Sequence, residues 1–163
     1  MVPLSMPSTL NIRRNRLSEF VEKAIRDRFP DAVVDSSAVF GVLNVKITKE
    51  SLLDICRMLH DGPNLGFDYL ADVTSIDWQD RIEVVYQLSN LSTNCRIALR
   101  VDLDRQKPEI DSVCPVWNGA NYQEREVYDL MGIVFKGHPE LERILLPKDW
   151  EGYPLRKDYV IPD

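Results

Sequence analysis

A regular alternation of apolar and polar side chains over residues 95–103 constrains the fold more than any other feature of this chain. Apolar members such as Ile97 and Leu99 fall on one side of an extended backbone, and charged residues fall on the other. Because successive side chains of a strand point to opposite faces, the run predicts a strand with one buried and one wet face. Residues 67–73 and 82–88 alternate in the same way. These runs indicate a largely antiparallel sheet covered by helices on one face.

Three segments repeat their apolar residues at the period of an amphipathic helix. They span residues 17–29, 52–59 and 118–131. Pro30 ends the first, and Gly62 follows the second. Gly132 follows the third, where we expect the left-handed conformation. Thr48 and Asn118 are the expected N-caps of the second and third helices.

Residues 32–34 and 39–47 are expected to form two further strands, separated by a turn at residues 35–37. The predicted order is therefore α-β-β-α-β-β-β-α, an α+β fold with a mixed, largely antiparallel sheet and an extended C-terminal tail. The expected organisation is a disordered lead over 1–9, a single α+β domain over 10–146 and an extended partner-binding tail over 147–163.

Composition excludes several classes of function. The net charge of −6 argues against a nucleic-acid module, which needs an excess of cations. Cys56, Cys95 and Cys114 are too widely spaced for an iron–sulfur cluster or a structural zinc, and we interpret them as reduced thiols. No apolar run approaches the roughly 20 residues that span a bilayer. Pro3 and Pro7 interrupt the start of the chain, so no signal peptide is expected and the chain is predicted to be cytoplasmic.

Charged residues around the third helix could be interpreted as a catalytic cluster. Glu124, Asp129 and His138 would make a stand-alone metal-dependent hydrolase, a distant alternative. Their spacing is poor for it, because residues five apart on a helix diverge and no HExxH motif is present. Arg125 and Asp129 are four apart, which predicts a helix-surface ion pair that shapes a docking face. His138 before Pro139 is most simply interpreted as a turn residue.

The tail over residues 147–163 is rich in proline, glycine, aromatic and charged residues and has no regular period. We expect it to be mobile in the free chain and to bind a partner through Trp150, Tyr153 and Tyr159. Arg156 is suited to hold a carboxylate in two parallel hydrogen bonds. The alternative is a tail that folds back on its own domain, and composition does not separate the two.

The stretch from Glu124 to Tyr159 contains ERE-x-YD-x-x-GI-x-F-x-GHP-x-L-x-RIL followed by G-x-P-LRKDY. This pattern resembles the C subunit of the proton-pumping NADH:quinone oxidoreductase, respiratory complex I. The segment LADVTSIDW agrees, and the resemblance extends over most of the chain. Glu142 departs from it, since many members carry a basic residue there. We also expect no long partner-wrapping extension, because only four residues follow Tyr159.

The resemblance implies a non-catalytic structural subunit of the peripheral arm, on the cytoplasmic side of the membrane. It implies that the chain binds chiefly the neighbouring D subunit, which helps to form the quinone site, and touches the membrane only through the complex. NADH, flavin, iron–sulfur clusters and quinone would be bound by other subunits. The equivalent subunit of an energy-converting hydrogenase, or of another quinone-linked dehydrogenase, is the close alternative. The residues expected to contact partners are Glu124, Arg125, Asp129, His138, Pro139, Arg143, Trp150, Tyr153, Arg156, Lys157, Asp158 and Tyr159.

Overall fold

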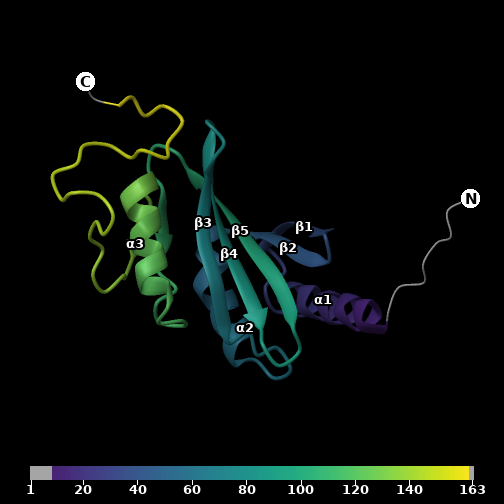
Figure 1. The fold of residues 1–163 in the computed structure, drawn as a ribbon. Helices are drawn as coiled ribbons and strands as arrows, with labels where there is room; N and C mark the ends of the chain where they lie inside the picture. Colours follow the sequence, from purple (N-terminus) through teal and green to yellow (C-terminus); the bar gives the residue numbers. More distant parts are fainter. Residues whose placement is uncertain (1–8, 162–163) are drawn as a thin grey trace, which may run out of the picture.

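The computed structural model describes residues 9–161, with side chains described from Arg16 onward (Figure 1). The expected disordered lead lies almost wholly outside these residues. The helices are α1 (Thr9–Arg28), α2 (Leu52–Asp61), which follows a short 3-10 turn η1 (Lys49–Ser51), and α3 (Ala120–Met131). The strands are β1 (Val33–Val39), β2 (Val42–Ile47), β3 (Tyr69–Asp77), β4 (Arg81–Asn90), β5 (Cys95–Asp104), β6 (Glu109–Asp111) and β7 (Val134–Lys136).

Five strands form one twisted sheet in the order β1-β2-β5-β4-β3. Only the β2–β5 pair is parallel, and the other three pairs are antiparallel. β4 and β5 pair over their whole length in the register that the alternating pattern requires. The predicted α+β class with a largely antiparallel mixed sheet is confirmed.

One face of the sheet and the three helices share a single apolar core. Ile25 of α1, Leu59 of α2 and Met131 of α3 join the same buried cluster as Tyr86 and Leu99 of the sheet. Each such side chain gains about 1.5–3 kcal/mol on leaving water. The three helices therefore pack against the apolar face of the sheet, as the sequence predicted.

The opposite face of the sheet carries paired charges. Glu83 is only 3% exposed, and Arg100 donates hydrogen bonds to its two carboxylate oxygens at 3.1 and 2.7 Å. Trp78 donates its indole N–H to the same carboxylate at 3.1 Å. Lys46 lies 2.8 Å from Asp102. Because each of these charges has an opposite charge beside it, the polar face avoids the cost of a buried unpaired charge.

The turn between the first two strands lies at Phe40 and Gly41, not at residues 35–37 as predicted. Both turn residues have positive φ, 50° and 76°, the signs of a tight hairpin turn. Residues 35–37 belong to β1 and pair with β2, with a register shift between Val33 and Asp35. The prediction was wrong because Asp and Ser favour turns only when long-range pairing does not claim them.

Other local predictions also fail. Thr48 bonds to the Ser51 hydroxyl instead of a free helix amide, and Gly119 occupies the N-cap position expected for Asn118. The pair β6–β7 was not predicted, because strands of three residues are too short to show a period. This small parallel sheet lies beside α3 and positions the loops around it.

Candidate functional site

Helix α3 and the chain that follows it hold most of the residues selected from the sequence. The helix ends at Gly132 with φ 71° and ψ 30°, so the predicted left-handed stop is confirmed. A Cβ at this position would also come within 2.5 Å of the Tyr153 ring. Glycine is therefore required both by the conformation and by the close approach of the tail.

Asp129 on α3 is fully buried and binds the backbone of residues 144–146. Its Oδ2 accepts hydrogen bonds from the consecutive N–H groups of Ile144, Leu145 and Leu146 at 3.0, 2.7 and 3.0 Å. Arg143 donates to its Oδ1 at 2.7 Å. Burial alone would raise the pKa of Asp129, but the N–H donors and Arg143 outweigh it, and the pKa is lowered. The Asp129 carboxylate is therefore charged. The N–H groups of residues 144–146 stabilise this charge only while the segment stays in place against α3.

The predicted ion pair between Arg125 and Asp129 is wrong. Arg125 instead donates from Nε to the carbonyl oxygen of Glu142 at 3.1 Å and lies 3.7 Å from the Glu140 carboxylate. A four-residue spacing permits the pair. It does not form because converging backbone N–H groups hold Asp129 more strongly than a partner on the helix surface could.

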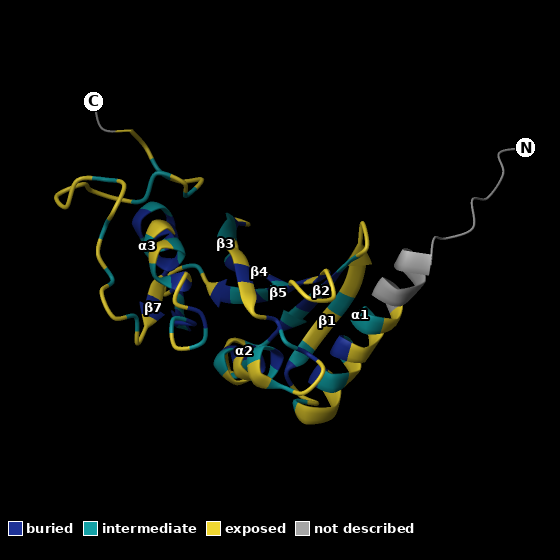
Figure 2. Ribbon diagram, turned by 60° about the horizontal axis from the view of Figure 1, so that its bottom comes forward, coloured by how far each residue is buried: buried dark blue, intermediate teal, exposed yellow. Residues whose placement is uncertain are grey.

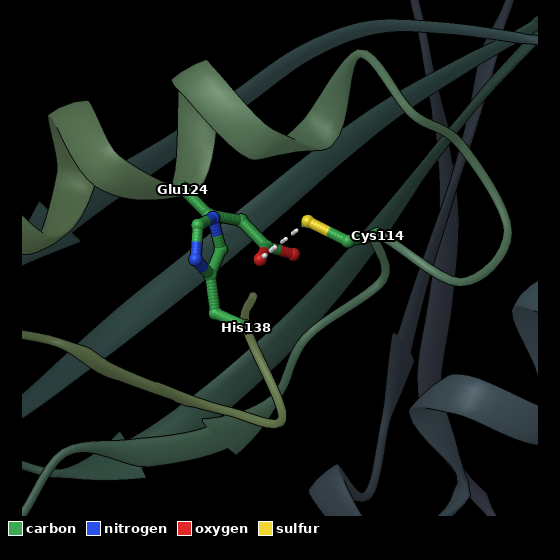
Figure 3. A group of neighbouring side chains, drawn as sticks. All are labelled: Cys114, Glu124 and His138. Atoms are coloured by element: carbon green, nitrogen blue, oxygen red, sulfur yellow. Dashed lines mark hydrogen bonds between the residues drawn. The ribbon is translucent and has the colours of Figure 1, made fainter. Parts of the chain in front are cut away.

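Glu124 is also fully buried, but its surroundings differ from those of Asp129. Ser112 Oγ donates to Oε2 at 2.6 Å, and the Val113 N–H donates to Oε1 at 2.7 Å. The Cys114 thiol lies 3.5 Å from Oε2 (Figure 3). Burial raises the pKa of Glu124, and these hydrogen bonds offset the increase only in part. The group ties the loop after β6 to the first turns of α3.

Cys114, Glu124 and His138 bring three possible metal-binding atoms within 4.8 Å of one another (Figure 3). The ring of His138 is nevertheless engaged at both nitrogens. Its Nδ1 accepts from the Glu140 N–H at 2.9 Å, so Nε2–H donates to the Asn121 carbonyl at 3.0 Å. Burial raises the pKa of Cys114 to about 11, which disfavours the thiolate that binds metals. Since Asp129 binds a different segment, the arrangement gives no support to the hydrolase alternative.

The chain after Pro147 lies against its own domain, the second of the two alternatives for the tail (Figure 1). The Leu155 N–H donates to the Leu130 carbonyl at 3.1 Å, and Arg156 Nε donates to the Met131 carbonyl at 2.7 Å. Both acceptors lie at the C-terminal end of α3, where carbonyl groups lack partners within the helix.

A second attachment joins the tail to the sheet at the end of β3. Asp77 accepts the N–H of Lys157 at 2.9 Å and two hydrogen bonds from Arg105 at 3.1 and 2.9 Å. Arg105 also lies 2.9 Å from Asp158. Hydrogen bonds from Arg105 lower the pKa of Asp77, more than burial raises it. These contacts favour a tail that is already in place over one that is free until a partner arrives.

Several apolar side chains of residues 144–161 point to solvent. We call the following residues the tail strip: Ile144, Leu145, Trp150, Leu155, Val160 and Ile161, with 36% to 82% of each residue exposed. Figure 2 shows most of this part of the chain as exposed. Backbone polar groups are thus satisfied internally, while apolar side chains remain available for contact.

The other selected residues occupy different positions. Pro139 and Lys157 are exposed, and Tyr159 is half-buried beside Gly152. Sequence reasoning missed Asp77, Arg105, Ser112 and Cys114 as members of this region. Their partners here lie ten or more residues away along the chain, so no local pattern could have indicated them.

The model of one protein family, described as "Respiratory-chain NADH dehydrogenase, 30 Kd subunit", matches residues 45–163. This range includes most of the sheet, α3 and the tail. The chain belongs to this family. The C subunit of the NADH-quinone oxidoreductase of Moorella thermoacetica is 51% identical over 145 residues, covering 88% of this chain and 95% of the relative. The C subunit of the same enzyme from Roseiflexus sp. (strain RS-1) is 44% identical over 141 residues, covering 85% and 81%.

Two solved structures share the fold of this chain. The trypsin-resistant fragment (1-134) of Nqo5 matches with a TM-score of 0.63 and 32% identity, covering 77% of this chain and 99% of the fragment. A chain of the membrane-bound sulfane sulfur reductase, an archaeal respiratory membrane complex, matches with a TM-score of 0.74 and 25% identity, covering 88% and 85%. The family resemblance inferred from Glu124 to Tyr159 is therefore confirmed: the chain belongs to the family of the C, or 30 kDa, subunit of the respiratory-chain NADH-quinone oxidoreductase, complex I. Within residues 9–161, no helix has both the length and the apolar character needed to cross a membrane.

Proposed function

We propose that this chain has a structural role and docks through the tail strip onto the D subunit, the neighbour that helps to form the quinone site. It then belongs to the peripheral arm of a membrane-bound NADH:quinone oxidoreductase, on the cytoplasmic side of the membrane. It is non-catalytic, and NADH, flavin, iron–sulfur clusters and quinone bind to other subunits. Residues 147–163 act as the partner-binding tail.

The observation that carries the proposal is the orientation of the segment from Arg143 onward. Asp129 and the end of α3 hold its backbone, while Leu145 and Leu155 are 57% and 60% exposed. A surface that is already ordered loses little conformational entropy on binding, so its apolar area contributes more to affinity. Aromatic side chains such as Trp150 are enriched in the buried centres of interfaces.

The candidate catalytic groups support a non-catalytic role. Glu124 and His138 have their polar atoms engaged within the chain, and Cys114 remains a thiol at neutral pH. An iron assay and a visible spectrum of the chain made under anaerobic conditions check this part. Stoichiometric iron with charge-transfer bands would contradict it.

The docking proposal is tested with the purified D subunit and the full-length chain. Leu145→Asp should weaken binding at least about tenfold, since it places a charge in the apolar contact. Val39→Asp is the matched control, because Val39 is 47% exposed but lies on β1, outside the tail strip. Both free variants should melt as the wild type does. Equal binding by wild type and Leu145→Asp would contradict docking through the strip.

A second candidate is the equivalent subunit of a related complex, such as an energy-converting hydrogenase or another quinone-linked dehydrogenase. The match to a chain of the sulfane sulfur reductase supports this second candidate, since it covers 88% of the present chain. Purification of the tagged chain from its native membrane separates the two. Co-purification of NADH-oxidising subunits supports the first, and their absence beside a different donor-oxidising subunit supports the second.

A further inference from the structure

Two arginines lie against one aromatic ring at the base of the tail. The guanidinium carbons of Arg143 and Arg156 are 5.2 and 5.1 Å from the centre of the Tyr153 ring. Both distances fall within the range of a cation–π contact. Tyr153 is itself confined, because its ring occupies the space beside Gly132. The ring therefore orients both guanidinium groups.

The hydrogen-bonding capacity of the two arginines differs. Arg143 donates from Nη1 to the carbonyl and the carboxylate of Asp129, both at 2.7 Å, and from Nη2 to the carbonyls of Trp150 and Gly152 at 3.1 and 3.0 Å. Arg156 donates from Nε to the Met131 carbonyl. Within residues 9–161, neither Nη group of Arg156 has a hydrogen-bond partner. Both Nη groups of Arg143 are thus engaged, whereas Arg156 keeps the four N–H donors of its Nη groups available.

Among the described residues, no carboxylate forms an ion pair with Arg156 either. The adjacent carboxylate, Asp158, is paired with Arg105 and does not neutralise it. Lys157 on one side of Arg156 is an exposed cation, and Leu155 on the other side belongs to the tail strip. If a partner covers the strip, the cation of this half-buried arginine would lose water without gaining an anion, which is unfavourable. The partner must therefore supply a group that accepts hydrogen bonds and carries negative charge.

We infer that Arg156 is a receptor for a carboxylate of the D subunit, an Asp or Glu side chain bound by the two Nη groups. The inference rests on the proposed docking. A planar fork held by the Tyr153 ring and by the Met131 carbonyl matches the two oxygens of a carboxylate. An ammonium group would offer a point charge without this match.

The simpler alternative is that Arg156 only caps α3. Its Nε bond to Met131 places a cation at the C-terminal end of the helix, where it is favourable. In that case substitution would lower the melting temperature of the free chain and leave the affinity of the folded chain unchanged. The two roles are therefore separable by measuring both quantities.

The experiment compares the full-length wild type, Arg156→Lys and the matched control Arg96→Lys for affinity to the purified D subunit and for melting temperature. Arg156→Lys keeps the charge but loses the fork, and should bind at least about tenfold more weakly. Arg96→Lys makes the same substitution at an exposed arginine of β5, outside the tail, and should change affinity by less than about threefold. If wild type and Arg156→Lys bind equally while Leu145→Asp does not bind, the carboxylate receptor is overturned and docking stands. If the wild type does not bind the D subunit, both are overturned.

A charge-reversal scan identifies the partner group. Arg156→Glu is combined in turn with each exposed Asp→Arg or Glu→Arg substitution of the D subunit. One reversed position should restore at least about tenfold of the lost affinity, because it recreates the pair in the opposite sense. If none does, Arg156 meets carbonyl groups or only caps the helix, and the inference fails.

Discussion

The sheet and the tail of this protein are stabilised in opposite ways. In the sheet, apolar side chains such as Leu99 and Tyr86 face the core, and charged side chains such as Arg100 face outward. The segment from Arg143 onward is instead attached through the buried carboxylates of Asp129 and Asp77, and its apolar side chains such as Leu145 face solvent. The sheet is therefore complete as a folded unit, whereas the tail has apolar surface that its own chain does not bury.

This difference determines how stability is distributed. The core spreads its free energy over more than thirty buried apolar residues, so one residue contributes a small share. The tail depends on a few carboxylates, chiefly Asp129 and Asp77, each of which accepts several hydrogen bonds. Loss of one such carboxylate leaves several donors without a partner at once.

The largest effect is expected from Asp129→Ala. It leaves three backbone N–H groups without an acceptor and Arg143 without its carboxylate in a buried site, which should lower the free energy of unfolding by about 3–5 kcal/mol. Glu126→Ala is the control, since Glu126 lies on the same helix with much of its surface in solvent, and should change it by less than about 0.5 kcal/mol. Urea unfolding measures both. If Asp129→Ala is as stable as the control, the hydrogen bonds to the Asp129 carboxylate do not stabilise the protein. The proposed difference between the tail and the sheet would then be wrong.

A matched pair of leucine substitutions tests the two regions directly. Leu99→Ala should cost about 2–5 kcal/mol, because Leu99 is fully buried in β5. Leu145→Ala should cost less than about 0.5 kcal/mol in the free chain, because its side chain faces solvent. Thermal or urea unfolding of the free chain gives both values. A large cost at Leu145 would mean that its side chain packs inside the domain, and would remove it from the tail strip.

The sheet was predictable because a buried face imposes a period on the sequence. The run around Leu99 and the stop at Gly132 each depend on neighbours in the chain, and both are confirmed. The Phe40–Gly41 turn was missed because the Asp-Ser-Ser run before it carries a stronger local turn pattern. Local composition there competes with strand pairing that depends on distant residues.

The candidate site was only partly predictable for a related reason. The family motif located Asp129 and Arg143, but the helix spacing assigned Asp129 to Arg125. A spacing rule describes what a helix surface permits, and it contains no information about a loop that returns to the same carboxylate. Arg105 and Cys114 lie outside the motif and reach it only through the fold.

The smallest expected effect is a difference in the response to pH between the carboxylates of the tail and Glu124. Folding lowers the pKa of Asp77, chiefly through Arg105, so the native state binds fewer protons there than the unfolded chain. Its contribution to stability is complete above the ordinary Asp pKa of about 3.9 and is lost as the pH falls through the lowered value. Folding raises the pKa of Glu124, chiefly through burial. Its contribution is complete below the ordinary Glu pKa of about 4.3 and is lost as the pH rises through the raised value.

Urea unfolding of wild type, Asp77→Asn and Glu124→Gln between about neutral pH and about pH 3 separates the two responses. Near neutral pH, Asp77→Asn should be less stable than wild type by about 1.5–3 kcal/mol, and the difference should shrink below about pH 4 because Asp77 then takes up a proton in the unfolded chain. Glu124→Gln mimics the protonated acid, so its stability relative to wild type should increase as the pH rises. Parallel curves for all three proteins would mean that neither carboxylate changes its proton affinity on folding. Opposite trends would show that the tail is held by charge and that the loop after β6 is held by a carboxyl group that resists ionisation.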